Sequence, residues 1–409
     1  CDQLVYYTND DYCVAYNDVI LTQDSQVISS DTLYYWSEID SIQGLGSVKI
    51  IDSASKRELE SNRLYISSPD SISTILKLYD SAKALNIVKK RFLEANRYPE
   101  SNPTALKLQL VKELKQKNIS TENLIVGNGS NEVLDFIARA YLSKNDEVIF
   151  SKHSFLVYRI VANIMDAKIV ETKPISIRDE NYLGTDLSAI YDKITKKTKL
   201  IFIANPNNPT GTILDYAQIQ EFLGSISKKI IVVIDEAYSE YAEYCNEVSS
   251  INLLKKHSNL IITRTFSKIY ALAGLRIGYG ISSKEIVRKL NYYRQPFNTN
   301  LFGQLMATEA LKDKQYVSDS LVKNFKGINY LKNQINKLGI DLLGTYGNFL
   351  SFNLGKKTKA IFNKLLMNGI ILRPLDNYDL KNYLRVSVGK DTENKKFITV
   401  LKKLIISRK

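Results

Sequence analysis

The feature of this sequence that most limits its fold is a series of short apolar runs separated by helical patterns. The runs predicted to be buried strands lie at residues 147–150, 168–171, 199–204, 230–234, 260–263 and 277–281, with a shorter one at 123–126. Strands that are apolar throughout are buried on both faces, which is typical of parallel sheets covered by helices. The sequence therefore predicts an α/β fold with a large mixed, mostly parallel sheet and a smaller α+β domain.

The chain, at 409 residues, is long enough for more than one domain. Residues 1–60 contain short, tyrosine-rich strands and turns without a clear period, and we treat them as an N-terminal extension. We predict an N-terminal arm with part of the small domain at 61–100, the large domain at 101–324 and the C-terminal small domain at 325–409. Helical patterns occur at 104–115, 330–338, 360–368 and 394–406.

Composition narrows the functional classes. The longest aliphatic run, at 230–234, is far shorter than the roughly 20 residues of a membrane span, so we expect no membrane partner. The net charge of +13 is spread along the chain without a nucleic-acid-binding motif, which favours small phosphorylated ligands over nucleic acid. Three scattered cysteines and two histidines fit neither a disulfide framework nor a metal site, and they indicate a reducing, cytoplasmic compartment.

Four polar motifs follow predicted strands, at the sheet edge where open α/β proteins bind ligands. Residues 127–132, GNGSNE, precede a helix, so the glycines and the helix N-terminus suit a phosphate. The plain alternative is a capped turn with Ser130 as the N-cap. Residues 205–211, NPNNPTG, predict either a rigid double turn or a support that points an Asn side chain into a site.

The other two motifs carry charge. Residues 235–238, DEAY, close an apolar strand, where Asp235 would be desolvated and need a partner; the alternative is a surface helix cap. Residues 264–268, RTFSK, place Lys268 after another apolar strand. Burial there would lower the pKa of the amine and make it a nucleophile that can form a Schiff base, whereas the alternative is a solvated basic turn. Each motif is weak alone, but their order and spacing together indicate one site.

Together the motifs resemble the fold-type I pyridoxal-phosphate enzymes, and among them the histidinol-phosphate aminotransferase group of the class I and II aminotransferases. The resemblance covers about residues 90–409. It includes further stretches at 96–100 (NRYPE), 271–279 (ALAGLRIGY), 296–298 (PFN), 348–350 (NFL) and 384–389 (LRVSVG). It implies pyridoxal 5′-phosphate as the cofactor, no metal, and a role in amino-acid biosynthesis.

The resemblance assigns roles around the cofactor. Lys268 would bind it as an imine and then move a proton between the substrate Cα and the cofactor. Asp235 would face the pyridine nitrogen and keep it protonated, so that the ring accepts electrons. Tyr238 and Asn208 would hydrogen-bond the phenolic oxygen of the ring, and Phe155 would stack on it unless it is plain core. The phosphate ligands implied are Ser130, Asn131, Thr265, Ser267 and Arg276.

The resemblance also implies partners. Tyr98 would reach the cofactor phosphate of a neighbouring subunit, which implies a homodimer with shared sites. Arg385 would bind a substrate carboxylate or phosphate bidentately, with Arg373 beside it, although both could be ordinary surface arginines. The small-molecule partners implied are L-glutamate, 2-oxoglutarate and a small phosphorylated substrate.

The sequence departs from the family at several positions. The family usually has Asp where Asn131 stands, and Pro-Thr where His153 and Ser154 stand. It also carries an Asn-Glu-Asn-Pro segment upstream of NRYPE, where this chain has residues 64–73 instead. Because that segment helps to close over the substrate, its absence leaves the identity of the substrate open.

The N-terminal extension has a resemblance of its own. Residues 35–40, YWSEID, with Leu45 are similar to the closing segment of sugar-phosphate and phosphocholine-type nucleotidyltransferases. Since the chain also begins at Cys1 rather than Met, we expect it to be the C-terminal part of a bifunctional polypeptide. The substrate could then be a small phosphorylated amine or ketone destined for a nucleotide-activated product.

Three functional hypotheses follow. The first is an aminotransferase between L-glutamate and a phosphorylated ketone or amine, with histidinol phosphate as the named substrate. The second is a decarboxylase of an O-phospho-amino acid, like the threonine-phosphate or serine-phosphate decarboxylases. The segment at 271–274 and the strand of Arg385 favour amino transfer. The third, a regulator that kept the cofactor but lost turnover, is disfavoured because Lys268, Asp235 and Arg276 are all present.

Overall fold

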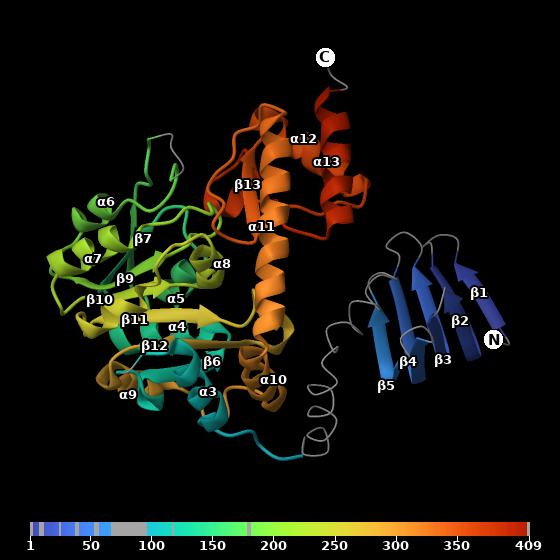
Figure 1. Cartoon of the computed structure of the whole chain (residues 1–409), viewed down its shortest axis with the longest axis horizontal. Helices are drawn as coiled ribbons and strands as arrows, with labels where there is room; N and C mark the ends of the chain where they lie inside the picture. Colours follow the sequence, from blue (N-terminus) through green and yellow to red (C-terminus); the bar gives the residue numbers. More distant parts are fainter. Residues whose placement is uncertain are drawn as a thin grey trace. The chain divides into compact units, whose positions relative to one another are not determined.

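The computed structural model describes residues 96–116, 118–177 and 181–406, and the backbone of five strands within residues 3–66. The chain divides into two compact units, Cys1–Glu94 and Ala95–Lys409 (Figure 1). Most of the predicted arm, residues 67–95, lies outside the described residues, and so do residues 37–40 of the nucleotidyltransferase-like segment.

The first unit contains an antiparallel sheet whose five strands pair in chain order. The strands are β1 (Gln3–Tyr7), β2 (Tyr12–Gln23), β3 (Gln26–Trp36), β4 (Ser41–Asp52) and β5 (Arg57–Ile66). The prediction of short strands was wrong for β2 to β5, which have 10 to 12 residues. The register shifts within each of their pairings, and such bulges interrupt the two-residue alternation that marks a strand in a sequence.

A seven-stranded sheet forms the centre of the second unit, in the order β6-β12-β11-β10-β9-β7-β8. The strands are β6 (Leu124–Asn128), β7 (Glu147–Ser151), β8 (Lys168–Thr172), β9 (Thr198–Ala204), β10 (Ile231–Asp235), β11 (Leu260–Thr265) and β12 (Ile277–Ile281). Only β12 among them runs antiparallel to its neighbours. The predicted mixed, mostly parallel sheet is therefore confirmed, and every predicted strand lies within two residues of its observed bounds.

Helices cover both faces of this sheet, and the residues of β10 show why. Val232 and Ile234 pack into one apolar cluster with α3 (Thr104–Leu114), α7 (Tyr216–Ser225) and α10 (Leu301–Lys312). Ile231 and Val233 point the other way, into a cluster with α4 (Ser130–Tyr141), α5 (Val157–Ile164) and α9 (Lys284–Tyr293). Because alternate residues face opposite sides, a strand buried on both must be apolar throughout.

The small domain packs helices on a three-stranded antiparallel sheet, in the order β13-β15-β14. Its strands are β13 (Phe349–Asn353), β14 (Arg373–Pro374) and β15 (Tyr383–Ser387). Its helices α12 (Thr358–Met367) and α13 (Asp391–Ile406) lie close to the predicted ones. Among the described residues, no helix combines the length and apolar character needed to cross a membrane.

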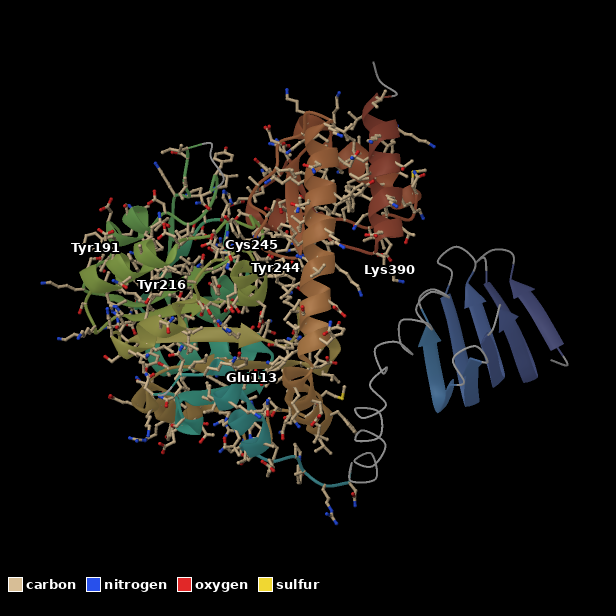
Figure 2. The ribbon with its side chains drawn as sticks, viewed as in Figure 1. Glu113, Tyr191, Tyr216, Tyr244, Cys245 and Lys390 are labelled. Carbon is tan, nitrogen blue, oxygen red and sulfur yellow. The ribbon has the colours of Figure 1, made fainter. Side chains whose placement is uncertain are left out.

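Helix α11 (Lys314–Asn336) joins the two domains (Figure 1). The prediction of a helix only at 330–338 was wrong about its start, and the predicted domain boundary at 324/325 falls inside α11. Its second half packs Leu331 and Ile335 into the small-domain core. Its first half has no fully buried residue and instead contacts the large domain, where the Phe325 ring lies 5.6 Å from the Tyr244 ring, centroid to centroid. Tyr244 ends α8 (Ser239–Tyr244) and is labelled in Figure 2.

Candidate active site

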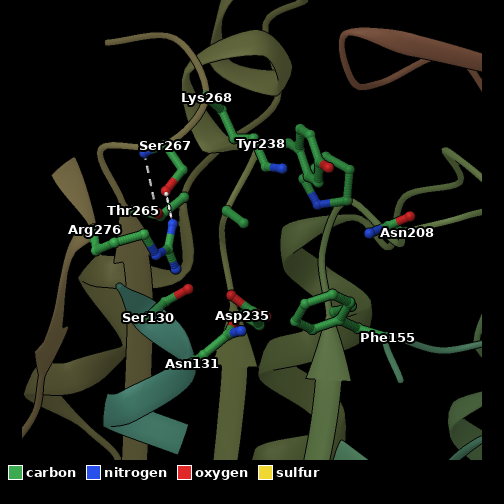
Figure 3. A pocket seen from close by; sticks show the side chains of 13 residues that line it. Ser130, Asn131, Phe155, Asn208, Asp235, Tyr238, Thr265, Ser267, Lys268 and Arg276 are labelled. Carbon is green, nitrogen blue, oxygen red and sulfur yellow. Dashed lines mark hydrogen bonds between the residues drawn. The ribbon is translucent and has the colours of Figure 1, made fainter. Parts of the chain in front are cut away.

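A cavity of about 170 Å³ opens at the carboxyl ends of β9, β10 and β11 (Figure 3). Ten of the thirteen predicted site residues line it: Ser130, Asn131, Phe155, Asn208, Asp235, Tyr238, Thr265, Ser267, Lys268 and Arg276. The remaining lining residues, which the sequence did not single out, are Ala204, Pro206 and Ala237. Residues from six separate segments of the chain thus meet at one edge of the sheet, as the carboxyl ends of parallel strands require.

One end of the cavity is built to hold an anion. Gly129 has φ +79°, and a Cβ atom there would lie 2.3 Å from Nη2 of Arg276, so the guanidinium rests against the start of α4. Arg276 donates from Nη1 to Oγ of Ser267 at 3.2 Å, and the backbone N–H of Ser267 donates to Oγ1 of Thr265 at 3.1 Å. Free N–H groups, the helix dipole and a guanidinium converge here, which suits a phosphate. The N-cap is Gly129, so the alternative that Ser130 merely caps the helix is wrong.

A buried carboxylate lies at the end of β10. Asp235 is 4% exposed and accepts hydrogen bonds from the Tyr158 hydroxyl at 3.0 Å and from Oγ1 of Thr263 at 2.9 Å. Burial raises the pKa of Asp235, while these two hydrogen bonds and Lys268 oppose the rise. The alternative of a surface helix cap is therefore wrong. A buried carboxylate that accepts two hydrogen bonds can orient a cationic N–H group above it.

Tyr158 and Thr263 were missed by the sequence reasoning. Thr263 is the direct neighbour of Asp235 in the pairing of β10 with β11, so only the strand register reveals it. Tyr158 stacks on Phe202 with ring centroids 4.6 Å apart and lies edge-on to Phe155 at 5.9 Å. Its position three residues after Phe155, at helical spacing, was the available signal.

An amine lies above this carboxylate. The Lys268 side chain extends into the cavity, with Nζ 5.4 Å from the centroid of the buried Tyr238 ring (Figure 3). Burial lowers the pKa of Lys268, the charge of Arg385 lowers it further, and Asp235 acts in the opposite direction. Burial also raises the pKa of the Tyr238 phenol, which keeps it a hydrogen-bond donor. A desolvated lysine of this kind can act as a nucleophile and as a base, and the solvated-turn alternative is wrong.

The proline-rich loop after β9 is a tight turn and also supplies a site residue. Its turn closes where the backbone N–H of Asn207 donates to the carbonyl of Thr212 at 2.9 Å. Asn208 lines the cavity, and its Oδ1 accepts a hydrogen bond from the Arg385 guanidinium. The segment is therefore both a tight turn and a support that places the Asn208 side chain at the cavity.

Three predicted residues do not line the cavity. Arg385 and Arg373 are direct partners in the pairing of β14 with β15, so their side chains share one face of the small sheet. The Arg385 guanidinium lies 5.0 Å over the Phe349 ring, while Arg373 is exposed. Tyr98 is 82% exposed and stacks on Phe297 at 4.8 Å, so the structure does not bring it into the cavity of its own chain. Among the described residues no His, Cys, Asp and Glu group could hold a metal.

Comparisons with known proteins agree with this geometry. The family model for class I and II aminotransferases matches residues 74–401. A relative, histidinol-phosphate aminotransferase 1 of Idiomarina loihiensis, is 42% identical over 307 residues, covering 75% of this chain and 81% of its own. The solved histidinol-phosphate aminotransferase of Clostridium acetobutylicum is 27% identical with a TM-score of 0.72, covering 79% of this chain and 95% of its own. The enzyme of the same name from Sinorhizobium meliloti, solved with pyridoxal-5′-phosphate, is 24% identical with a TM-score of 0.72, covering 80% and 88%.

Proposed function

Because the chain belongs to the class I and II aminotransferases, we propose that it transfers an amino group between L-glutamate and a small phosphorylated ketone or amine. It is a pyridoxal-phosphate-dependent enzyme of the histidinol-phosphate aminotransferase type, and histidinol phosphate is the substrate that we expect. The observation that carries the proposal is a half-buried Lys268 and a buried Asp235 that line one cavity with the N-terminus of α4.

The residues of the cavity fit the cofactor. Its phosphate would be held by the start of α4 and by Arg276, with Thr265 and Ser267 beside them. The two hydrogen-bond donors to Asp235, Tyr158 and Thr263, are neutral, so its carboxylate can hold the protonated pyridine nitrogen. When bound, pyridoxal phosphate supplies an electron sink that stabilises negative charge at the substrate Cα.

Lys268 would provide the covalent link and the proton transfer. Its lowered pKa makes the neutral amine easier to form, and a neutral amine can take the proton from the substrate Cα. Tyr238 and Asn208 would hydrogen-bond the ring oxygen of the cofactor, and Phe155 would cover one face of the ring. These roles divide the chemistry among groups that the structure already holds in one cavity.

The substrate would bind at Arg385, with Arg373 on the same face of the small sheet. A guanidinium binds carboxylate and phosphate in the same bidentate way, so one site can serve glutamate and a phosphorylated partner in turn. The relatives described above are aminotransferases, so decarboxylation of an O-phospho-amino acid is the less supported alternative.

The proposal also covers the oligomeric state of the enzyme and its place in the cell. The exposed Tyr98 suits a role in the site of a second subunit, which supports a homodimer. The scattered cysteines support a reducing compartment, and we place the enzyme in the cytoplasm. The five-stranded sheet of the N-terminal unit, which ends at Ile66, lies before the matched family segment, and this supports its origin in a second enzyme of a bifunctional polypeptide.

The experiment is a visible spectrum of the purified protein with pyridoxal phosphate, before and after L-glutamate. We expect a yellow band that bleaches with one equivalent of 2-oxoglutarate formed per site, and no such band in Lys268→Ala. A band that glutamate leaves unchanged would contradict the donor assignment and direct the search to phospho-amino acids. The absence of any band in the wild type would refute the cofactor assignment.

A further inference from the structure

The loop between β7 and α5 carries a buried histidine that the mechanism above does not use. His153 lies two residues before Phe155 and is 6% exposed, but it does not line the cavity. It is one of only two histidines in the chain. Burial of so polar a side chain requires a partner, and the partner indicates what the residue does.

The partner of the His153 ring belongs to the small domain. Nδ1 lies 2.7 Å from the backbone oxygen of Tyr378. Because a carbonyl oxygen can only accept, Nδ1 must carry the proton. Tyr378 ends the short helix Asp376–Tyr378, which lies between β14 with Arg373 and β15 with Arg385. The hydrogen bond therefore ties the loop of Phe155 to the segment that connects the two substrate arginines.

The backbone of His153 makes a second link. Its carbonyl oxygen accepts a hydrogen bond from Nδ2 of Asn207 at 2.9 Å. The next residue, Asn208, accepts from the Arg385 guanidinium. Two hydrogen-bonded links therefore join the same two segments. His153 bonds to Tyr378, which leads along the chain to β15 and Arg385. Arg385 bonds to Asn208, and the preceding Asn207 bonds back to His153.

Apolar packing surrounds this circuit. Tyr378, Leu375 and Leu380 of the small domain are buried in one cluster, against which Leu156 and Leu183 of the large domain pack. The neighbouring Lys152 and Asp379 form an ion pair at 3.5 Å with both side chains about half exposed, and such a pair stabilises little. The buried hydrogen bond from His153 to Tyr378 therefore fixes how the two domains are oriented and spaced where they meet.

We propose that His153 is a positioning residue that holds the substrate arginine Arg385 in register with the cofactor cavity. This inference rests on the proposed function, because it concerns the affinity for the anionic substrate at that site. Burial lowers the pKa of His153, while the Tyr378 carbonyl and Asp379 raise it and Lys152 lowers it. The contact of Nδ1 with a carbonyl oxygen places a proton on Nδ1.

Two substitutions distinguish a positioning role of His153, which needs its hydrogen bond, from a packing role, which needs only its volume. His153→Asn puts an amide N–H close to the position of Nδ1 and keeps the donor, whereas His153→Leu keeps the bulk and removes it. His257→Asn, at the other histidine, is the matched control, since His257 lies outside the site. For each holoenzyme we would measure the glutamate concentration that half-saturates the bleaching, the maximal bleaching rate, and the dissociation constant of pyridoxal phosphate from the apoprotein.

We expect His153→Leu to raise the half-saturating glutamate concentration about fivefold to tenfold, as the loss of one hydrogen bond implies. The maximal rate and the cofactor dissociation constant should stay within about twofold of the wild type, and His153→Asn and His257→Asn should match it. Equal values for His153→Leu and the wild type would overturn the inference. Weaker cofactor binding in both His153 variants would overturn it too, because that result shows a local structural role.

The tautomer of His153 is a readout that does not depend on activity. It is measured from the ¹⁵N chemical shifts of wild-type protein labelled at histidine, and comparison with labelled His257→Asn assigns the signals to His153. We expect the proton on Nδ1 of His153, and a proton on Nε2 alone would refute the inference even if His153→Leu fails to fold. A wild type that glutamate does not bleach contradicts the proposed function. A wild type that bleaches beside an unaffected His153→Leu contradicts only the role of His153.

Discussion

Replacement of Gly129 by alanine tests the anion-binding end of the cavity. Gly129 connects β6 to α4 with φ +79° and ψ 165°, a conformation that residues with a Cβ rarely adopt. A Cβ there would also lie 2.3 Å from Nη2 of Arg276. Gly129→Ala must therefore strain the turn and displace the guanidinium from its place against the start of α4.

The two effects have different sizes and readouts. The backbone strain should lower the free energy of unfolding by about 1–3 kcal/mol. Displacement of Arg276 removes charge-assisted hydrogen bonds to the cofactor phosphate, worth about 1.5–3 kcal/mol, and should weaken cofactor binding about tenfold to a hundredfold. Lys268 and Asp235 are untouched, so the variant saturated with cofactor should keep its yellow band.

The assay is titration of the apoprotein with pyridoxal phosphate, followed by urea unfolding. The matched control is Gly224→Ala, at the exposed end of α7, where an added Cβ would meet nothing within 4 Å. That change should leave cofactor binding unchanged and raise the free energy of unfolding by up to about 1 kcal/mol. Cofactor affinity within twofold of the wild type in Gly129→Ala would refute the assignment of the phosphate to this end.

Two more predictions concern buried charge. Glu236 is 3% exposed and accepts from Nη2 of the buried Arg264 at 2.8 Å, so Glu236→Gln should lower the free energy of urea unfolding by about 3 kcal/mol. The exposed pair of Glu122 and Lys284 is the control, where Glu122→Gln should lower the free energy of unfolding far less than Glu236→Gln; equal decreases would contradict the buried-pair argument. The rate at which the apoprotein binds pyridoxal phosphate covalently should rise with pH around a midpoint below the ordinary lysine pKa of 10.5, because only the neutral amine of Lys268 reacts. In Arg385→Gln that midpoint should move upward, and an unchanged midpoint would show that Arg385 does not act on Lys268.

The sheet and the residues that line the cavity were predictable because their signals are local. A strand buried on both faces is apolar throughout, and a ligand residue placed directly after such a strand stands out by its polarity. Asp235 and Lys268 are examples, each at or just beyond the end of an apolar run. The helix start at Lys314 was missed although Val317 and Leu321 lie one turn apart on α11 and pack against the cluster of Tyr238. That helical spacing of apolar residues was the available signal.

The contacts that could not be predicted from the sequence join segments that are far apart along the chain. The Tyr158 hydroxyl and Asp235 are 77 positions apart, and His153 and Tyr378 are 225 positions apart. Neither pair has a spacing that a periodicity or a motif can report, because register and domain packing decide it. The resemblance pointed to Arg385, but only the structure shows that Asn208 connects it to the cavity.

This difference in origin separates the residues proposed for the cofactor from the arginines proposed for the substrate. Every residue that lines the cavity belongs to the large domain, at or just beyond the sheet edge, so one rigid sheet fixes the positions of Lys268 and Asp235. Arg385 and Arg373 belong to another sheet, which is held to the large domain by the hydrogen bond of Arg385 to Asn208 and by the contact of His153 with Tyr378. Substitutions in that connection can therefore change the affinity for the anionic substrate without disturbing Lys268 or Asp235. A single aminotransferase scaffold can in this way keep its chemistry while its phosphorylated substrate changes.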